Sequence, residues 1–251
     1  MNTQTSQLLN KVPELTLFFW IIKVLGTTVG ETAADFLAFN LHMGLTNTSF
    51  LMGALLLIFL VLQIKGKQYI PTIYWTTVVL ISIVGTLITD DLVENFGVSL
   101  QTTTIMFSLL LIFTFIFWKI SEKSLSVHSI FTRKRELFYW TAILFTFALG
   151  TAAGDLISEQ MHFGYLLSLI LFSSVIIVIM IAYNLFKLDA VFSFWGAYIL
   201  TRPLGASLGD LLTQPIKYHG LGFSSLFISL VFFIAIISLV IYLTRKQNRI
   251  V

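Results

Sequence analysis

The sequence predicts an all-helical protein that crosses a membrane eight times, and three observations predict this fold class. Of its 251 residues, 57% are hydrophobic and 11% are charged, and the mean hydropathy is +0.92, which excludes a water-soluble domain of this length. Eight stretches are apolar over the roughly 20 residues that a helix needs to cross a bilayer of about 30 Å. One sequence motif also recurs four times, once in every second stretch.

The eight expected spans follow one another along the chain, four in each half. The first carries Glu31 and Asp35 where a signal peptide would have the small residues of its cleavage site, so we expect this span to be retained. The expected spans cover about residues 15–38, 46–64, 71–93, 99–118, 136–158, 163–186, 190–213 and 221–243.

The recurring motif is an aromatic residue followed by Trp, a glycine ten residues after the Trp, and an aspartate fifteen residues after it. Its four copies contain Trp20, Trp75, Trp140 and Trp195, then Gly30, Gly85, Gly150 and Gly205, then Asp35, Asp90, Asp155 and Asp210. The third and fourth copies repeat the first two with one common period, which indicates two successive duplications. The chain then divides into a first half (1–118), a linker (119–135) and a second half (136–251).

Each repeat is expected to be a helical hairpin, in which the first helix carries the motif and the second returns. All four hairpins run the same way, so the repeats should be related by a pseudo-axis along the membrane normal. The returning spans contain no Asp, Glu, Lys or Arg. We therefore expect the motif helices inside the bundle and the returning helices against lipid.

The basic residues predict the orientation. Twelve of the 15 Lys and Arg flank span ends that would share one side, which the positive-inside rule makes cytoplasmic, together with both termini. The four motif Trp residues would then form an aromatic belt at that interface. The formal charge of +3 follows from this topology and gives no indication of nucleic acid as a partner. Cys is absent, which excludes disulfides, thiolate metal sites and thiol catalysis.

Small residues ten and fourteen positions after each Trp predict how the motif helices pack. Such small-xxx-small pairs let helix backbones approach closely. The glycines at these positions are Gly30, Gly85, Gly150, Gly154, Gly205 and Gly209.

A polar stripe lies beside this ridge, at seven, eleven and fifteen residues after each Trp, and residues four apart share a helix face. The stripe ends at the motif aspartate, so four helices around one axis would gather Asp35, Asp90, Asp155 and Asp210 near the outer half of the membrane. Carboxylates there are costly unless they are paired or functional. The alternative is that they cap helix ends or face headgroup water.

Three further charges lie inside the motif spans. Glu31 is deeper than the aspartates and has no acidic equivalent in the other repeats. Arg202 is expected to partner Glu31 or an aspartate when no substrate is bound. Lys23 shares a helix face with Glu31 and is either a coupling residue or internal counter-charge, as Glu31 and Arg202 could also be, or a side chain that snorkels to the headgroups.

Three histidines lie near the aspartate ends of the repeats. His42 and His162 obey the 120-residue period, and His219 occupies a similar place in the fourth repeat. They could form an outer metal-entry site, because His is a common metal ligand, or could simply be solvated loop residues.

The motif segments resemble a known family. The segments are KVPELTLFFWIIKVLGTTVGETAADF in the first repeat, GTAAGDL in the third and GASLGDL in the fourth. They resemble a bacterial membrane family defined by a short repeat of unknown function in four copies, and the resemblance spans nearly the whole chain. It implies a multi-pass protein of the bacterial inner membrane and supplies no activity.

These features favour a secondary transporter or exporter of a small hard cation, with a divalent metal such as Mn²⁺ as the leading substrate. Carboxylate and hydroxyl oxygens suit hard cations, and the absence of Cys argues against copper(I). The expected metal ligands are the four motif aspartates and Glu31, and Glu31 is also the candidate for proton coupling. No cofactor is expected beyond the transported ion; the partners are the lipid bilayer and the cation, and a homo-oligomer is compatible with the sequence.

Two other classes remain open. An intramembrane enzyme could use two of the aspartates as a dyad, although the Gly-to-Asp spacing differs from that of GxGD-type proteases. A receptor or assembly subunit without transport activity would more typically carry a large soluble domain, and the chain has no segment for one.

Overall fold

The computed structural model describes residues 10–247, and every regular element within this range is a helix. Eight of these helices are long: α2 (Leu17–Asp35), α3 (Leu45–Lys65), α4 (Pro71–Asp90), α5 (Leu100–Glu122), α6 (Arg133–Asp155), α7 (Gly164–Phe186), α8 (Ala190–Thr213) and α9 (Ser225–Gln247). The prediction of an all-helical bundle with eight long helices is confirmed. All except α8 are apolar enough to cross a membrane by length and composition. Polar and small residues such as Arg202, Gly205 and Asp210 keep the most apolar stretch of α8 below that of the other seven helices.

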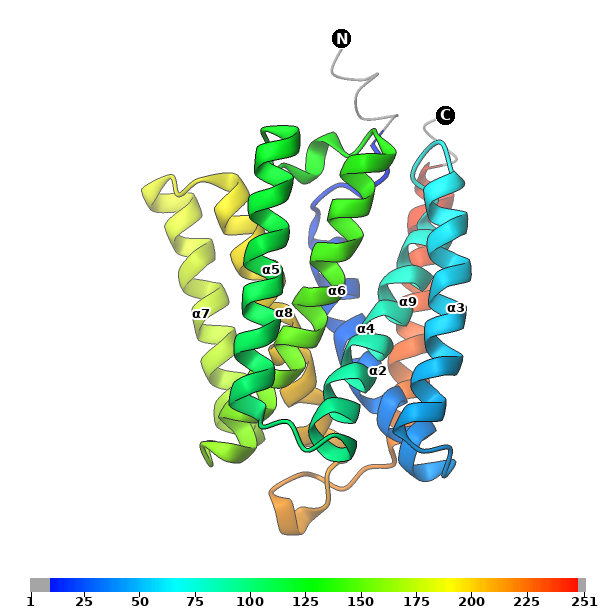
Figure 1. The fold of residues 1–251 in the computed structure, drawn as a ribbon, viewed down its shortest axis with the longest axis vertical. Helices are drawn as coiled ribbons and strands as arrows, with labels where there is room; N and C mark the ends of the chain where they lie inside the picture. The colour runs from blue at the N-terminus through cyan, green and yellow to red at the C-terminus, as the bar shows by residue number, and fades with distance from the viewer. Residues whose placement is uncertain (1–9, 248–251) are drawn as a thin grey trace.

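The motif helices form the inside of the bundle and the returning helices form the outside (Figure 1). In the most apolar part of α2, α4 and α6, 61–78% of the residues are buried, whereas in α3, α5, α7 and α9 the share is 17–22%. The inner helices contact one another in a closed ring, α2–α4–α6–α8–α2. The described chain ends, near residues 10 and 247, lie at the same end of the bundle (Figure 1). The last turns of α3 and α5 and the first turn of α6 lie at this end too, and they carry Lys65, Lys119 and Arg135. We call this the basic end, and we call the opposite end the aspartate end.

Each returning helix packs mainly against the inner helix of the next repeat rather than that of its own. Thus α3 lies on α4, α5 on α6 and α7 on α8, and α9 of the last repeat closes the circle on α2 of the first. A single hairpin therefore has no core of its own, and the two halves of the sequence share one ring.

Four glycines bring the inner helices into contact. A Cβ atom at Gly30 would clash with Ser82, one at Gly85 with Phe147, one at Gly150 with Arg202 and one at Gly205 with Thr27. In every repeat the glycine ten residues after the Trp thus faces the residue seven after the Trp of the following repeat. The same contact occurs at all four seams of the ring. Gly154 and Gly209 have more room, with closest contacts of 3.5 Å to Pro203 and 3.2 Å to Glu31.

The inner helices end in a shared way. In α2, α4 and α6, the motif aspartate is the last α-helical residue, and a single π-helical turn follows, at Phe36–Asn40, Asp91–Asn95 and Leu156–Gln160. Single π-helical turns inside longer helices are often found at functional sites. The fourth repeat differs, because α8 continues through Asp210 to Thr213 and a 3₁₀ turn (Ile216–Tyr218) follows.

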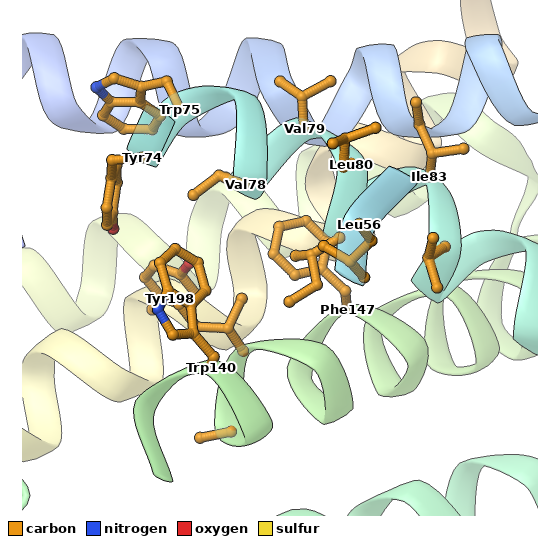
Figure 2. Close-up of a cluster of buried hydrophobic side chains, with 14 of the residues drawn as sticks. Leu56, Tyr74, Trp75, Val78, Val79, Leu80, Ile83, Trp140, Phe147 and Tyr198 are labelled. Atoms are coloured by element: carbon orange, nitrogen blue, oxygen red, sulfur yellow. The ribbon is translucent and has the colours of Figure 1, made fainter. Parts of the chain in front are cut away.

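Aromatic side chains from the inner helices pack together toward the basic end, and Tyr74, Trp75, Trp140 and Tyr198 belong to one buried cluster (Figure 2). Trp75, Trp140 and Trp195 are only 2–5% exposed. The Trp75 indole donates a hydrogen bond to the Tyr69 hydroxyl, and the Trp195 indole donates to the Leu125 carbonyl. The prediction that they form an interfacial belt is therefore wrong for these three residues. They lie on inner helices, so their side chains pack against other helices. Only a Trp on a lipid-facing helix could contact the headgroups.

The segment expected as a linker, 119–135, is partly helical, since α5 continues to Glu122 and α6 begins at Arg133. Arg135 fixes the turn between them by donating hydrogen bonds to the carbonyls of Ser124 and Ser126 at 3.1 and 3.2 Å. The N-terminal segment packs against the same turn, and there Lys11 forms a buried ion pair with Glu136 at 2.6 Å. This contact ties the start of the described chain to the start of α6.

Candidate functional site

Side chains four residues apart on the inner helices form successive layers along the ring. Seven residues after the motif Trp, the layer contains Thr27, Ser82, Phe147 and Arg202, all fully buried. Eleven residues after it, the layer contains Glu31, Thr86, Thr151 and Ala206, at most 6% exposed. The next layer contains the four motif aspartates, of which Asp210 is 5% exposed and the other three are partly exposed. Polar groups thus continue from the aspartate end to the middle of the bundle.

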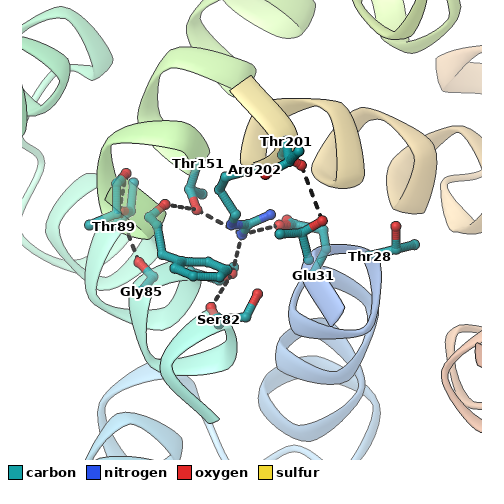
Figure 3. A network of polar contacts seen from close by, with 12 residues as sticks. Thr28, Glu31, Ser82, Gly85, Thr89, Thr151, Thr201 and Arg202 are labelled. Atoms are coloured by element: carbon teal, nitrogen blue, oxygen red, sulfur yellow. Dashed lines mark hydrogen bonds and ion pairs between the residues drawn. The ribbon is translucent and has the colours of Figure 1, made fainter. Parts of the chain in front are cut away.

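Arg202 lies at the centre of these layers (Figure 3). Its Nη2 donates hydrogen bonds to a Glu31 carboxylate oxygen at 2.6 Å, to the Thr151 hydroxyl at 2.8 Å and to the Thr86 hydroxyl. These three acceptors occupy the same motif position in the first three repeats. One side chain of the fourth repeat therefore joins all four inner helices.

The Arg202–Glu31 ion pair is buried on both sides, with the Arg202 side chain 0% exposed and that of Glu31 8% exposed. Nε and Nη1 of Arg202 have no hydrogen-bond partner among the described residues. Buried N–H groups of this kind are costly and usually meet water or a ligand. All three hydrogen bonds of the guanidinium therefore start from a single nitrogen, Nη2.

Glu31 is the common electrostatic neighbour of the aspartates. Charge–charge interactions connect it with Asp35, Asp90, Asp155 and Asp210, one from each repeat. Across residues 10–247, however, no three His, Asp or Glu side chains are close enough together to hold one metal ion. The structure brings the five carboxylates around one polar centre without forming a compact metal site.

Lys23 is also fully buried, one layer nearer the basic end than Arg202. Its ammonium nitrogen lies 4.0 Å from the centroid of the Phe147 ring and 4.2 Å from that of the Tyr198 ring. It has no hydrogen-bond partner among the described residues. Lys23 therefore points into the ring, where the snorkelling alternative would have directed it to the membrane surface.

The repeat pattern identifies the family. A family model described as Repeat of Unknown Function (DUF347) matches four segments of the chain, residues 18–69, 73–124, 138–188 and 193–249. The chain belongs to this family. Each matched segment comprises one inner helix and its returning helix, so one family repeat supplies one wall of the ring. No curated protein and no solved structure matches the chain.

The histidines lie at the outer edge of the family repeats and are all exposed. His42, His162 and His219 each adopt a left-handed backbone conformation, with φ of 55°, 59° and 66°, at turns that follow the inner helices. His162 and His219 line one cleft of about 550 Å³ between the third and fourth repeats, and His42 is not among its lining residues. The structure therefore brings two of the three together and keeps both apart from the buried layers.

Two parts of the site were not singled out from sequence. Thr86 and Thr151 belong to the predicted stripe, but ordinary threonines on apolar helices usually bond their own backbone, as both also do here. Tyr198, beside Lys23, continues the same four-residue step one turn before Arg202. Continuing the four-residue spacing back to the position three residues after each motif Trp would have identified Tyr198.

Proposed function

We propose that this member of the repeat family is a secondary transporter of a small cation, and that the cation binds where the Arg202 guanidinium now lies. The observation that carries the proposal is the set of oxygens around Arg202 Nη2. A carboxylate and two hydroxyls, from three different repeats, converge on one positively charged group in the middle of the bundle. An oxygen set that holds a buried cationic group is suited to a hard cation, and a divalent metal such as Mn²⁺ is the leading substrate.

The four motif aspartates would concentrate the substrate. Clustered carboxylates in a polar entrance raise the local cation concentration, and ionisable groups within a membrane typically mark an ion pathway. Asp35, Asp90 and Asp155 are partly exposed at the aspartate end, whereas the aromatic layers close the basic end. With the basic end in the cytoplasm of a bacterial inner membrane, this conformation would accept cations from outside.

Substrate binding requires Arg202 to leave Glu31. A second positive charge cannot share one buried carboxylate with the guanidinium without strong repulsion. Arg202 thus acts as an internal stand-in for the substrate, and it neutralises Glu31 when the site is empty of cation.

Mn²⁺ flux into proteoliposomes tests this function. Glu31→Gln alone would leave the Arg202 charge buried and unpaired, so the decisive variant is Glu31→Gln with Arg202→Gln, which removes both charges together. We expect this double variant to fold and to lose flux, and Asp90→Asn to retain the fold with reduced flux. A matched control is Glu14→Gln, an exposed carboxylate at the basic end of the bundle. Wild-type flux in the double variant would refute the proposed site.

A further inference from the structure

We infer that Lys23 is the proton-binding site of the transport cycle, so that cation binding at Glu31 drives proton release from the Lys23 ammonium. This inference rests on the proposed function and adds the coupling ion and the residue that carries it. It differs from the expectation that Glu31 exchanges the coupling proton, because Glu31 is paired with Arg202, which also donates hydrogen bonds to the hydroxyls of Thr86 and Thr151.

The geometry around Lys23 suits a group that changes its charge. A permanently charged side chain in the interior is normally paired and hydrogen-bonded, as Arg202 is with Glu31. The Lys23 ammonium has no hydrogen-bond partner among residues 10–247, and its surroundings are two aromatic ring faces at 4.0 and 4.2 Å. Ring faces attract the ammonium form, and they also accommodate the neutral amine without leaving a strong acceptor unpaired.

The neighbouring helices contribute few other ionisable groups. From α8, Arg202 and Tyr198 face Lys23, and Arg202 is the cation that interacts with it electrostatically. Across the ring, α6 contributes the apolar ring of Phe147. No carboxylate among residues 10–247 bonds to Lys23, so Arg202 is the charged neighbour that acts on it.

The remaining neighbours lie nearer the basic end. Tyr74 of α4 and Tyr139 of α6 form a hydrogen bond between their hydroxyls. The only ionisable side chain that α9 contributes within its apolar part is Tyr242, which packs against Phe18 with 5.4 Å between ring centroids. These phenols offer hydroxyls on the basic-end side of Lys23 and bring no negative partner to it.

Arg202 connects the two events. While Arg202 is paired with Glu31, its charge is largely compensated and Lys23 can keep its proton. A cation that takes Glu31 frees the guanidinium, and the uncompensated charge beside Lys23 then favours the neutral amine. The N–H bond of the ammonium breaks with its electron pair remaining on nitrogen, and the proton goes to water. When the cation leaves, Arg202 returns to Glu31 and Lys23 takes up a proton again.

The test measures cation binding and proton release on the same purified, full-length protein in detergent. Mn²⁺ is the probe, because binding removes its free electron paramagnetic resonance signal, and a pH-indicator dye in weak buffer reports released protons. Wild type should release about one proton per bound Mn²⁺, and its affinity should rise by up to about tenfold per pH unit over the range in which release occurs.

Two substitutions at Lys23 isolate its contribution. Lys23→Met has a similar length and no charge, and it should bind Mn²⁺ without proton release and with an affinity that does not vary with pH. Lys23→Arg keeps a charge that cannot be lost, and it should release no proton and bind Mn²⁺ at least tenfold more weakly. The matched control is Lys217→Met, which removes an exposed lysine that also lies over a ring, 4.5 Å from the centroid of Tyr218. It should behave like wild type.

The possible outcomes separate the two proposals. Proton release from Lys23→Met equal to that of wild type would overturn the assignment of Lys23 and leave the cation site standing. Loss of Mn²⁺ binding in a folded Lys23→Met protein would also overturn it, because Lys23 would then belong to the cation site itself. If wild type binds no Mn²⁺, the proposed function fails, and the coupling inference fails with it.

Discussion

Adding one methyl group at Gly85 tests one of the four close contacts between inner helices. An ideal Cβ atom there would lie 2.8 Å from Phe147 Cβ, 3.1 Å from the Ala148 nitrogen and 3.2 Å from the Phe147 carbonyl carbon. Two of these atoms belong to the α6 backbone and cannot rotate away. For Gly85→Ala, α4 and α6 would have to separate by roughly 0.5 Å, a gap that already forfeits about a quarter of the dispersion attraction across the seam.

The expected loss of stability follows from two opposing contributions. Overpacking of a tight core costs about 1–3 kcal/mol, and the better helix propensity of Ala returns up to about 1 kcal/mol. The net destabilisation of about 1–2 kcal/mol should lower the thermal midpoint by roughly 2–8 °C. Gly53→Ala is the matched control: Gly53 lies in α3 with no atom within 4 Å of its ideal Cβ, so only the propensity contribution applies.

Thermal unfolding of both variants in detergent, followed by Trp fluorescence, measures the difference. Gly85→Ala should unfold at a lower temperature than wild type, and Gly53→Ala at the same or a slightly higher temperature. Equal midpoints for the two variants would mean that α4 and α6 are not in contact at this glycine, and the closed ring would have to be abandoned.

Three further predictions concern other parts of the molecule. Lys11→Met should lower the free energy of unfolding by about 3–5 kcal/mol, because it leaves Glu136 buried without its ion-pair partner. Lys134→Met breaks a 3.5 Å ion pair with Glu122 in which the lysine is exposed, so it should lower that free energy by less than about 1 kcal/mol, and denaturant titration measures both. Thr151→Val should cost about 1.5–3 kcal/mol, because it removes a buried hydrogen bond from the charged Arg202 guanidinium. Thr114→Val removes a hydroxyl that bonds the Leu110 carbonyl of its own helix, and it should change stability much less in the same titration. In this Cys-free chain, Lys123→Cys and Lys217→Cys should react with an impermeant thiol reagent from opposite sides of the membrane, and labelling from one side for both would contradict the topology.

The architecture was predictable to the extent that it depends on composition and repetition. Apolar length predicted the eight helices, and the contrast between charged motif spans and uncharged returning spans predicted which would lie inside. The packing of α3 on α4, rather than on its own partner α2, could not be predicted. A short turn permits either arrangement, and an apolar returning helix carries no sequence signal for the neighbour it covers.

The helix face that carries the site could be predicted from the sequence, but the contacts between its side chains could not. Four-residue spacing identified the helix face that contains Glu31 and the aspartates. It could not show that Arg202 reaches Thr86 and Thr151, because the length of a guanidinium side chain allows several partners around a ring. The belt interpretation of Trp75 failed for a related reason: Trp near a span end usually marks the interface, but only on a helix that faces lipid.

The fourth repeat breaks the symmetry of the ring in the way that the proposed single-cation site requires. In the first three repeats, motif position eleven supplies an oxygen, and in the fourth it is Ala206, which supplies none; there Arg202, one turn earlier, reaches across instead. Pro203 follows directly and lies 3.0 Å from the ideal Cβ position of Gly150. Proline removes one hydrogen bond from the interior of α8 and makes that helix the easiest of the four to bend. Movement of Arg202 away from Glu31 is therefore expected to come from bending of α8 against α6, while α2, α4 and α6 keep the oxygen set in place.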